Sequence, residues 1–289
     1  MNSWRVFDKI FQSLVKSIIL YASPIYALRY LQDLEKIQTL FIKRILNLPQ
    51  CTPDYALRLE VGAPHIRILI FKQLINWTVK ILDIQDFRYP KICFLKQKAI
   101  SQFAANDTKY NWMNQIKQIF FKPINEDLIW DSLTSDLLKD KKTYLLNAYS
   151  NYLYNEDLFK CSKSTSLMLY SEIYLQSGAQ KYINLGLPMK LLRIFAQIRL
   201  LNIHNCKILI DATKHNLIDY SYCQNCGKSN DFLHKVVDCY LFSDIRAELG
   251  LKLQSNLDFF SLLEKPQSCK EVKKLVNLVN YVCRYNANL

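Results

Sequence analysis

Apolar residues recur at steps of three and four along most of this chain, and the residues that interrupt such a pattern are scarce: 5 glycines and 8 prolines occur among 289 residues. Three-and-four spacing places apolar side chains on one face of an α-helix. A β-rich fold needs frequent turns, and glycine and proline are the residues that most often build them. Half of the residues are hydrophobic, so the chain can bury a substantial core. We therefore expect an all-α fold.

The first part of the chain predicts a bundle-like group of helices. One helix is expected from 7 to about 21, where an apolar stripe runs up to Pro24, a residue that kinks or ends helices. A second is expected from 30 to 46, closed by Pro49. These two helices should pair as a hairpin.

Two more helices follow. The run Thr52-Pro53-Asp54 predicts a helix start, because threonine caps free amides, proline fits the first turn and aspartate suits the positive end of the helix dipole. This helix should stop near Gly62. The stretch 65–83 has the clearest helical spacing in the chain, and we interpret His65 at its start as a surface or capping residue.

The middle of the chain has weaker patterns. We expect short helices from 89 to 161, in which the tetrapeptide Asn-Glu-Asp-Leu occurs at 125–128 and again at 155–158. Paired carboxylates could indicate catalysis, but adjacent positions on a helix point apart, so we interpret both tetrapeptides as helix starts. The polar run 162–166 predicts a linker.

Two further amphipathic helices are expected, at 188–201 and at 270–284. Together these patterns predict three regions: a helical region over 1–88, a second over 89–185, and a third over 186–289.

The third region contains the motif with the clearest chemistry. Cys223, Cys226, His234 and Cys239 have the spacing C-x2-C-x7-H-x4-C, which suits a tetrahedral Zn2+ site. Gly227 permits the backbone conformation that such a knuckle requires. Three thiolates and one imidazole leave no open position, so the sequence predicts a structural zinc within a small module over 220–245. The alternative is four unligated buried side chains that share this spacing by coincidence.

The spacing also constrains the local backbone. Residues five apart lie about 140° apart around an ideal helix, so the segment from His234 to Cys239 must deform or end to present both ligands. Bound zinc would leave a formal charge of −1, which Lys228 and Lys235 are placed to offset. A looser group of possible ligands, which we interpret as non-metal, comprises His204, Cys206 and His215.

The chain has a net charge of +13, which favours a polyanionic partner such as RNA or DNA, although a basic surface can also serve solubility alone. Nine cysteines, an odd number, and a charged N-terminal start favour a reducing intracellular location, in the nucleus or the cytoplasm. The apolar stretch 17–28 is too short to span a bilayer, so no membrane partner is expected.

Motifs for catalysis are missing from the sequence. It contains no Asp-Asp pair, no G-x-S-x-G and no H-E-x-x-H, and its scattered glycines form no phosphate-binding loop. We therefore expect no enzymatic activity and no small-molecule substrate.

Several stretches of the first region carry a family likeness: IILYAS at 18–23, LEKIQ at 34–38, KRILNLP at 43–49 and TPDYALRLE at 52–60. They resemble the region after the polymerase core in non-LTR (LINE-like) retrotransposon reverse transcriptases. Nearer the other end, LRIFAQIRL at 192–200, the four-ligand set and CYLF at 239–242 resemble the family's C-terminal cysteine–histidine motif and its lead-in helix.

The resemblance implies a thumb-like helical region over 1–88 and a zinc module, without the polymerase and endonuclease catalytic centres. It also implies nucleic-acid binding around the zinc module. From charge and position, the expected contacts are Lys228, Lys235, Arg193, Arg199, Lys207 and Tyr222, with Tyr220 and Phe232 also beside the ligands. Two alternatives are a zinc-stapled protein-interaction module and a relic of a mobile element without a function.

Overall fold

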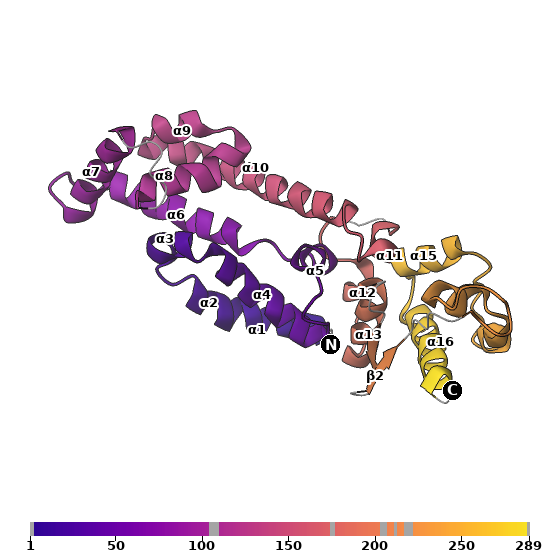
Figure 1. Ribbon diagram of the computed structural model, residues 1–289. Helices are drawn as coiled ribbons and strands as arrows, with labels where there is room; N and C mark the ends of the chain where they lie inside the picture. Colours follow the sequence, from indigo (N-terminus) through magenta and orange to yellow (C-terminus); the bar gives the residue numbers. More distant parts are fainter. Residues whose placement is uncertain are drawn as a thin grey trace. The chain divides into compact units, whose positions relative to one another are not determined.

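Figure 1 shows the computed structural model, which describes residues 3–103, 110–173, 177–202, 207–210, 213–216 and 222–287. The protein is all-α: helices make up most of the described chain, and a two-stranded hairpin is the only sheet within it. The chain packs as two compact units, one of Met1–Phe11, Thr39–Ala63 and Asp157–Leu289, the other of Gln12–Gln38 and Pro64–Glu156. The three regions expected from the sequence stay a prediction.

The unit of 12–38 and 64–156 is built around an aromatic core. The ring of Phe71 stacks on Phe120, with centroids 4.7 Å apart, and meets Tyr149 edge-on at 5.4 Å. Its helices are α2 (Lys16–Ile19), α3 (Ser23–Tyr26), the first half of α4 (Leu31–Leu46), α6 (Ile66–Asp83), α7 (Tyr89–Phe103), α8 (Trp112–Ile116), α9 (Asp127–Asp131) and most of α10 (Ser135–Ser162), with a π-helical turn at Lys117–Phe121 and 3-10 turns at Ala27–Arg29 and Lys122–Ile124.

The other unit surrounds α13 (Met189–Arg199), which packs against the C-terminal helix α16 (Cys269–Ala287) and against strand β1 (Lys207–Ile210). Strand β1 pairs with β2 (Thr213–Asn216) as an antiparallel hairpin. The other helices of this unit are α1 (Ser3–Ile10), α5 (Asp54–Val61), α11 (Met168–Ser171), α12 (Lys181–Asn184), α14 (Ser243–Glu248) and α15 (Asn256–Glu264), with a π-helical turn at His234–Asp238 and a 3-10 turn at Tyr240–Phe242.

The helices predicted from clear periodicity are confirmed. The first runs through α1, a π-helical turn (Phe11–Val15) and α2, and ends before Pro24, which lies in the first turn of α3. Helices α4 and α6 match their expected ranges to within one residue. Helix α5 ends at Gly62, whose φ of +66° is left-handed; an added Cβ would lie 2.2 Å from the amide nitrogen of Ala179, so only glycine fits.

The prediction of short helices throughout the middle is wrong, because α10 is 28 residues long. Its weak polar periodicity hid a buried row that includes Leu138, Leu145, Tyr149 and Leu153. The tetrapeptide at 125–128 does open α9, whereas the one at 155–158 lies inside α10, where Asp157 accepts two 2.7 Å hydrogen bonds from Arg58.

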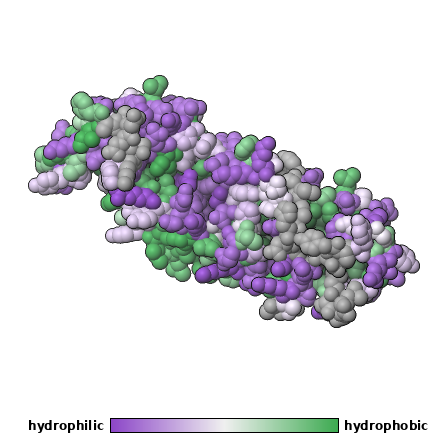
Figure 2. All heavy atoms as spheres, in the orientation of Figure 1, coloured by the Kyte–Doolittle hydropathy of each residue, from purple (hydrophilic) through white to green (hydrophobic). Residues whose placement is uncertain are grey.

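The surface of the protein is mixed in polarity (Figure 2). Over α2 and α3 a row of hydrophobic side chains is exposed, comprising Leu14, Ile18, Tyr21 and Ile25. Within the described chain no single helix has the length and apolar character to span a membrane; the pair Trp4–Ile19 and Ser23–Arg29, bent by 59°, meets that requirement by length and composition only.

Candidate metal centre

A tight turn presents the first two cysteines of the C-x2-C motif. The amide groups of Cys226 and Gly227 both donate to the carbonyl of Cys223, at 3.3 and 2.8 Å. The amide of Cys223 donates to the carbonyl of Lys228 at 2.8 Å. Gly227 has a φ of +65°, as the sequence predicts for this knuckle. An isolated bridge between Tyr222 and Ser229 closes the turn.

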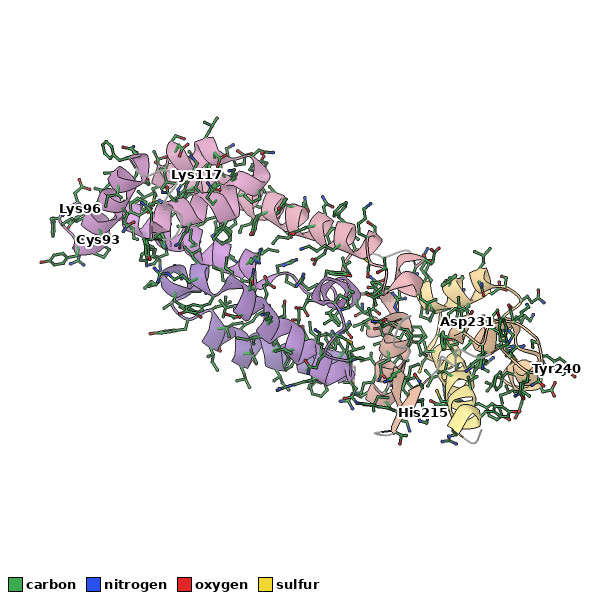
Figure 3. All side chains as sticks on the ribbon, in the orientation of Figure 1. Cys93, Lys96, Lys117, His215, Asp231 and Tyr240 are labelled. Atoms are coloured by element: carbon green, nitrogen blue, oxygen red, sulfur yellow. The ribbon has the colours of Figure 1, made fainter. Side chains whose placement is uncertain are left out.

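A deformed helical turn presents the other two ligands. The segment His234–Asp238 is π-helical, and Cys239 after it has an extended backbone with its amide 2.7 Å from the carbonyl of His234. The carboxylate of Asp231, which is labelled in Figure 3, accepts from the amide of His234 at 2.7 Å and so fixes the start of the turn. The prediction that the helix must deform here is confirmed.

These two elements bring the four predicted ligands together. The nearest ligand atoms of Cys223, Cys226, His234 and Cys239 all lie within 4.8 Å of one another, and three of the four residues are buried. The Sγ of Cys239 lies 3.8 Å from that of Cys223 and 3.9 Å from that of Cys226, far beyond the roughly 2.05 Å of a disulfide.

The imidazole of His234 supplies an independent test of the fit. Both of its ring nitrogens are buried, and neither has a hydrogen-bond partner in the described part of the protein. Buried polar atoms without partners are costly, and an ion between the four side chains would satisfy one of them. The four residues could therefore hold one metal ion.

The ionisation of the cysteine thiols also favours the binding of a cation to the cluster. Burial opposes ionisation of Cys223, but the nearby His234 imidazole and the amides of Asn225 and Cys226 outweigh burial and lower the pKa of this thiol to about 6. Burial raises the pKa of the Cys239 thiol to about 11, against an opposing hydrogen bond from the amide of Leu241. One thiolate thus forms easily, whereas a second beside it needs a compensating positive charge.

Arg246 is placed to offset this negative charge, and the sequence interpretation missed it. Its guanidinium donates to the carbonyl of Cys239 at 2.8 Å, and burial lowers its pKa against the opposing charges of Cys239, Asp238 and Cys226. Lys228 instead lies 3.5 Å from the carboxylate of Asp238.

Two predicted nucleic-acid contacts are corrected by the structure. Lys235 is buried, with only 3% of its surface exposed, because it lies on the π-helical turn that packs against α16. Arg199 is fully buried and pairs with Glu60, its Nε lying 2.6 Å from a carboxylate oxygen. Neither side chain is available to a phosphate at the surface, and Arg199 does not lie on a solvated helix face.

The other predicted contacts remain accessible in different degrees. Tyr222 and Lys228 are well exposed, and Lys207 is exposed on β1. Arg193 is half-buried and donates to the carbonyl of Ile45 at 2.7 Å. Phe232 is buried against Phe259, so it is a core residue and not an exposed contact.

Sequence interpretation also missed Tyr240, which follows the last ligand and is 77% exposed (Figure 3). Its adjacency to Cys239 mirrors that of Tyr222 to Cys223, and this symmetry was the available signal. Of the looser group, His204 and Cys206 lie outside the described residues, as does Tyr220, whereas His215 lies on β2.

The chain matches no known protein-family model, none of the curated proteins and no solved structure.

Proposed function

We propose that Cys223, Cys226, His234 and Cys239 bind one structural Zn2+. A zinc–sulfur bond is about 2.3 Å long, so two thiolates on a tetrahedral zinc lie about 3.8 Å apart. The observed separations of 3.8 and 3.9 Å support this, as does the soft donor set of three thiols and an imidazole. Zinc would offset most of the charge of the thiolates and fix the knuckle, and with four protein ligands it would leave no position for a substrate.

We further propose that the protein is a zinc-stabilised nucleic-acid-binding part of a polyprotein like those of non-LTR retrotransposons, acting without a catalytic centre of its own. The resemblance of its sequence and its net charge of +13 support this proposal. Lys228, Lys207 and Arg193 are the predicted basic contacts that remain outside the interior.

The observation that carries the proposal is the pair of exposed tyrosines at the ends of the ligand set. Tyr222 is 74% exposed and Tyr240 77%, and each adjoins a cysteine of the Cys223–Cys239 pair. The metal cluster therefore holds the backbones of both tyrosines together. Exposed aromatic rings stack on unpaired bases, for about 1 to 3 kcal/mol per base, and such stacking accepts any base. Single-stranded RNA or DNA is thus the favoured partner.

A salt titration of binding tests the function. Filter binding of a fluorescent single-stranded oligonucleotide should show log affinity falling linearly with log salt, with about 0.7 units of slope for each phosphate neutralised. The zinc-loaded protein should bind a single strand more tightly than a duplex of the same length. A flat salt response would reject nucleic-acid binding and favour the protein-interaction module, since solvated basic residues without a polyanionic partner release no counterions.

A further inference from the structure

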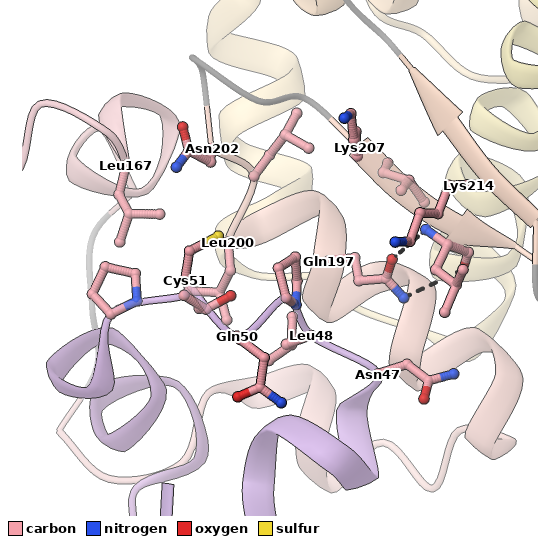
Figure 4. Close-up of a pocket in the computed structure, with 16 residues that line it drawn as sticks. Asn47, Leu48, Gln50, Cys51, Leu167, Gln197, Leu200, Asn202, Lys207 and Lys214 are labelled. Atoms are coloured by element: carbon pink, nitrogen blue, oxygen red, sulfur yellow. Dashed lines mark hydrogen bonds between the residues drawn. The ribbon is translucent and has the colours of Figure 1, made fainter. Parts of the chain in front are cut away.

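A cavity of about 410 Å³ lies in the unit that carries the metal cluster (Figure 4). The loop 47–53, the C-terminal end of α13 and the β-hairpin form its walls, and most of its lining is apolar. Ligand pockets of this size are mainly apolar with a few placed polar groups. The volume is enough for one small organic molecule.

Hydrogen bonds fix the loop that forms one wall. The ammonium group of Lys43 donates to the carbonyl of Gln50 at 2.9 Å and lies 2.8 Å from the carboxylate of Asp54. Lys43 is itself buried, so the loop is tied to α4 from within. This wall is therefore formed before any ligand arrives, which reduces the entropic cost of binding.

The opposite wall is fixed by one buried amide. The side chain of Gln197 accepts from the amide of Leu209 at 2.6 Å and donates to the carbonyl of the same residue at 3.4 Å, as the dashed lines in Figure 4 show. This pair of bonds holds β1 against α13. Gln197 is only 4% exposed, so this side chain serves to position the hairpin.

The register of the hairpin places two cations at this wall. Leu209 pairs with Lys214, and Lys207 lies two residues before Leu209 on the same strand, so all three side chains share one face of the hairpin. Both lysines line the cavity and are exposed. Neither makes an ion pair with any residue that the structure describes.

The lining chemistry selects among ligand classes. None of the described residues that line the cavity carries a carboxylate, so these residues offer no charged oxygen ligand to a divalent cation. A neutral apolar ligand would leave both lysines without a counter-charge. The amide side chains of Asn47, Gln50 and Asn202 add hydrogen-bonding groups at the lining, which suit a polar heterocycle better than a hydrocarbon chain.

We infer that this cavity binds one nucleotide, with its phosphate at Lys207 and Lys214 and its base between the apolar walls of the loop 47–53 and α13. Lysine is a common phosphate ligand, and apolar walls cover the faces of a base. The inference rests on the proposed function in naming a nucleotide as the ligand, but it concerns a site separate from the exposed tyrosines of the knuckle. A free nucleoside monophosphate and an unpaired nucleotide of a strand share this chemistry.

Cys51 provides a reporter, because its free thiol is exposed and lines the cavity. The zinc-loaded protein is treated with iodoacetamide, with and without saturating nucleoside monophosphate, and the modification of each cysteine is followed by mass spectrometry. Alkylation of Cys51 should slow at least about fivefold, a change of about 1 kcal/mol by the usual conversion. The exposed thiols of Cys93 and Cys269 are internal controls and should react at unchanged rates.

Two matched double variants test whether the lysines are responsible for the protection of Cys51 from alkylation. Lys207→Ala/Lys214→Ala should abolish protection of Cys51, whereas Lys181→Ala/Lys252→Ala removes two exposed charges elsewhere and should leave protection intact. Inorganic phosphate alone and the unphosphorylated nucleoside alone should each protect less than the nucleotide. Full protection in the Lys207→Ala/Lys214→Ala variant would overturn the inference.

A short 5′-phosphorylated single strand distinguishes the two sources of the nucleotide and the two proposals. Protection of Cys51 by the strand supports an unpaired nucleotide, and protection by the monophosphate alone supports a free one; either supports the pocket. Protection by the monophosphate without salt-dependent strand binding would reject the proposed function and keep the pocket. Strand binding that leaves Cys51 unprotected, with no protection by any monophosphate, would reject the pocket and keep the proposed function.

Discussion

Two buried polar clusters in the same compact unit differ in whether the protein supplies both signs of charge. At the first, the buried carboxylate of Glu60 accepts two hydrogen bonds from Arg199, which also donates to the carbonyl of Leu263 and to Gln180. At the second, three thiols surround an imidazole whose two nitrogens have no partner in the described chain. The first cluster contains its own cation, whereas the four side chains of the second together offer donor atoms for a metal ion.

The comparison explains why the first cluster needs no ligand, whereas the four side chains of the second could hold a metal ion. Burial alone would lower the pKa of Arg199, but Glu60 and the neighbouring tyrosines Tyr170 and Tyr182 hold it above its usual value. A buried ion pair is tolerable when its hydrogen bonds are satisfied. The three thiols can all ionise together only with further positive charge, which a bound metal ion would supply.

Removal of the metal should have the largest effect on stability, and this effect should be confined to the cluster of three thiols and one imidazole. Purified protein should contain about one zinc per chain, and zinc binding contributes on the order of 10 kcal/mol in small structural sites. Chelation should therefore unfold the knuckle and leave α13 protected, since α13 depends on Arg199 and its apolar packing. Hydrogen exchange across 222–242 and 189–199 measures both.

A cysteine pair serves as the control for the metal experiment. Cys226→Ser should abolish stoichiometric zinc, whereas Cys93→Ser, an exposed position on α7, should leave it intact. Zinc retained at one per chain in Cys226→Ser would show that the ligand assignment is wrong.

Removing one partner of the buried Glu60–Arg199 pair should cost about 3 to 5 kcal/mol of unfolding free energy, the usual range for a buried ion pair. Arg199→Met leaves the carboxylate of Glu60 buried without a cation, whereas Glu60→Leu/Arg199→Met removes both charges and should recover most of the loss. Urea denaturation measures the difference. Zinc content should not change in either variant.

The half-buried Arg193 is the matched control for this series. Arg193→Met loses one hydrogen bond to the carbonyl of Ile45 and should cost about 1 to 3 kcal/mol. A single Arg199→Met variant that is no less stable than Arg193→Met would contradict the role of the buried pair.

The same two clusters separate what the sequence could predict from what it could not. The ligands of the knuckle lie within 17 residues, so their spacing alone predicted the cluster and the deformed turn at His234–Asp238. Arg199 pairs with Glu60 across 139 residues, and its charge led to the prediction that it contacts nucleic acid at the surface. Long-range pairing of this kind leaves no local signal.

The β-hairpin and α10 were missed for related reasons. Strand β2 is Thr-Lys-His-Asn, which has no apolar alternation, and Gln197 holds its partner β1 in place from α13. Helix α10 is polar over most of its length, and the buried row that anchors it is defined by rings from other helices, such as Phe71. In both cases tertiary packing, and not local pattern, determines the element.

Removing the two exposed tyrosine rings should weaken nucleic-acid binding and leave the metal cluster folded. Tyr222→Ala/Tyr240→Ala should weaken single-strand binding by about 1 to 3 kcal/mol for each base that loses its stacking partner, and duplex binding less. Zinc content should stay at one per chain, because neither ring is a ligand. Tyr89→Ala removes an equally exposed ring from the other unit and should have no effect. Equal losses on single strand and duplex would contradict stacking.

The smallest loss of unfolding free energy is expected from a change at the start of α15, the helix that carries Leu263, whose carbonyl accepts a hydrogen bond from Arg199. Helix α15 begins with a capping box: the hydroxyl of Ser255 accepts from the amide of Asp258 at 3.3 Å, and the carboxylate of Asp258 accepts from the amide of Ser255 at 3.0 Å. Ser255→Ala should cost about 1 kcal/mol of unfolding free energy, measured by urea denaturation. Ser132→Ala is the control, since that exposed hydroxyl only donates to the carbonyl of Leu128.

The pH dependence of this cap has a definite sign. Hydrogen bonds from the amide of Gln254 and from Ser255 lower the pKa of Asp258 below its usual value. Because the folded-state pKa is the lower one, the stabilisation is complete above the unfolded pKa of about 3.9 and is lost as the pH falls through the folded pKa. The stability gap between wild type and Ser255→Ala should therefore be full at neutral pH and narrow in acid. A gap that widened in acid would mean that the carboxylate of Asp258 does not stabilise the start of α15, and Arg199 would then depend on the packing of Phe259 and Leu263 alone to position its carbonyl partner.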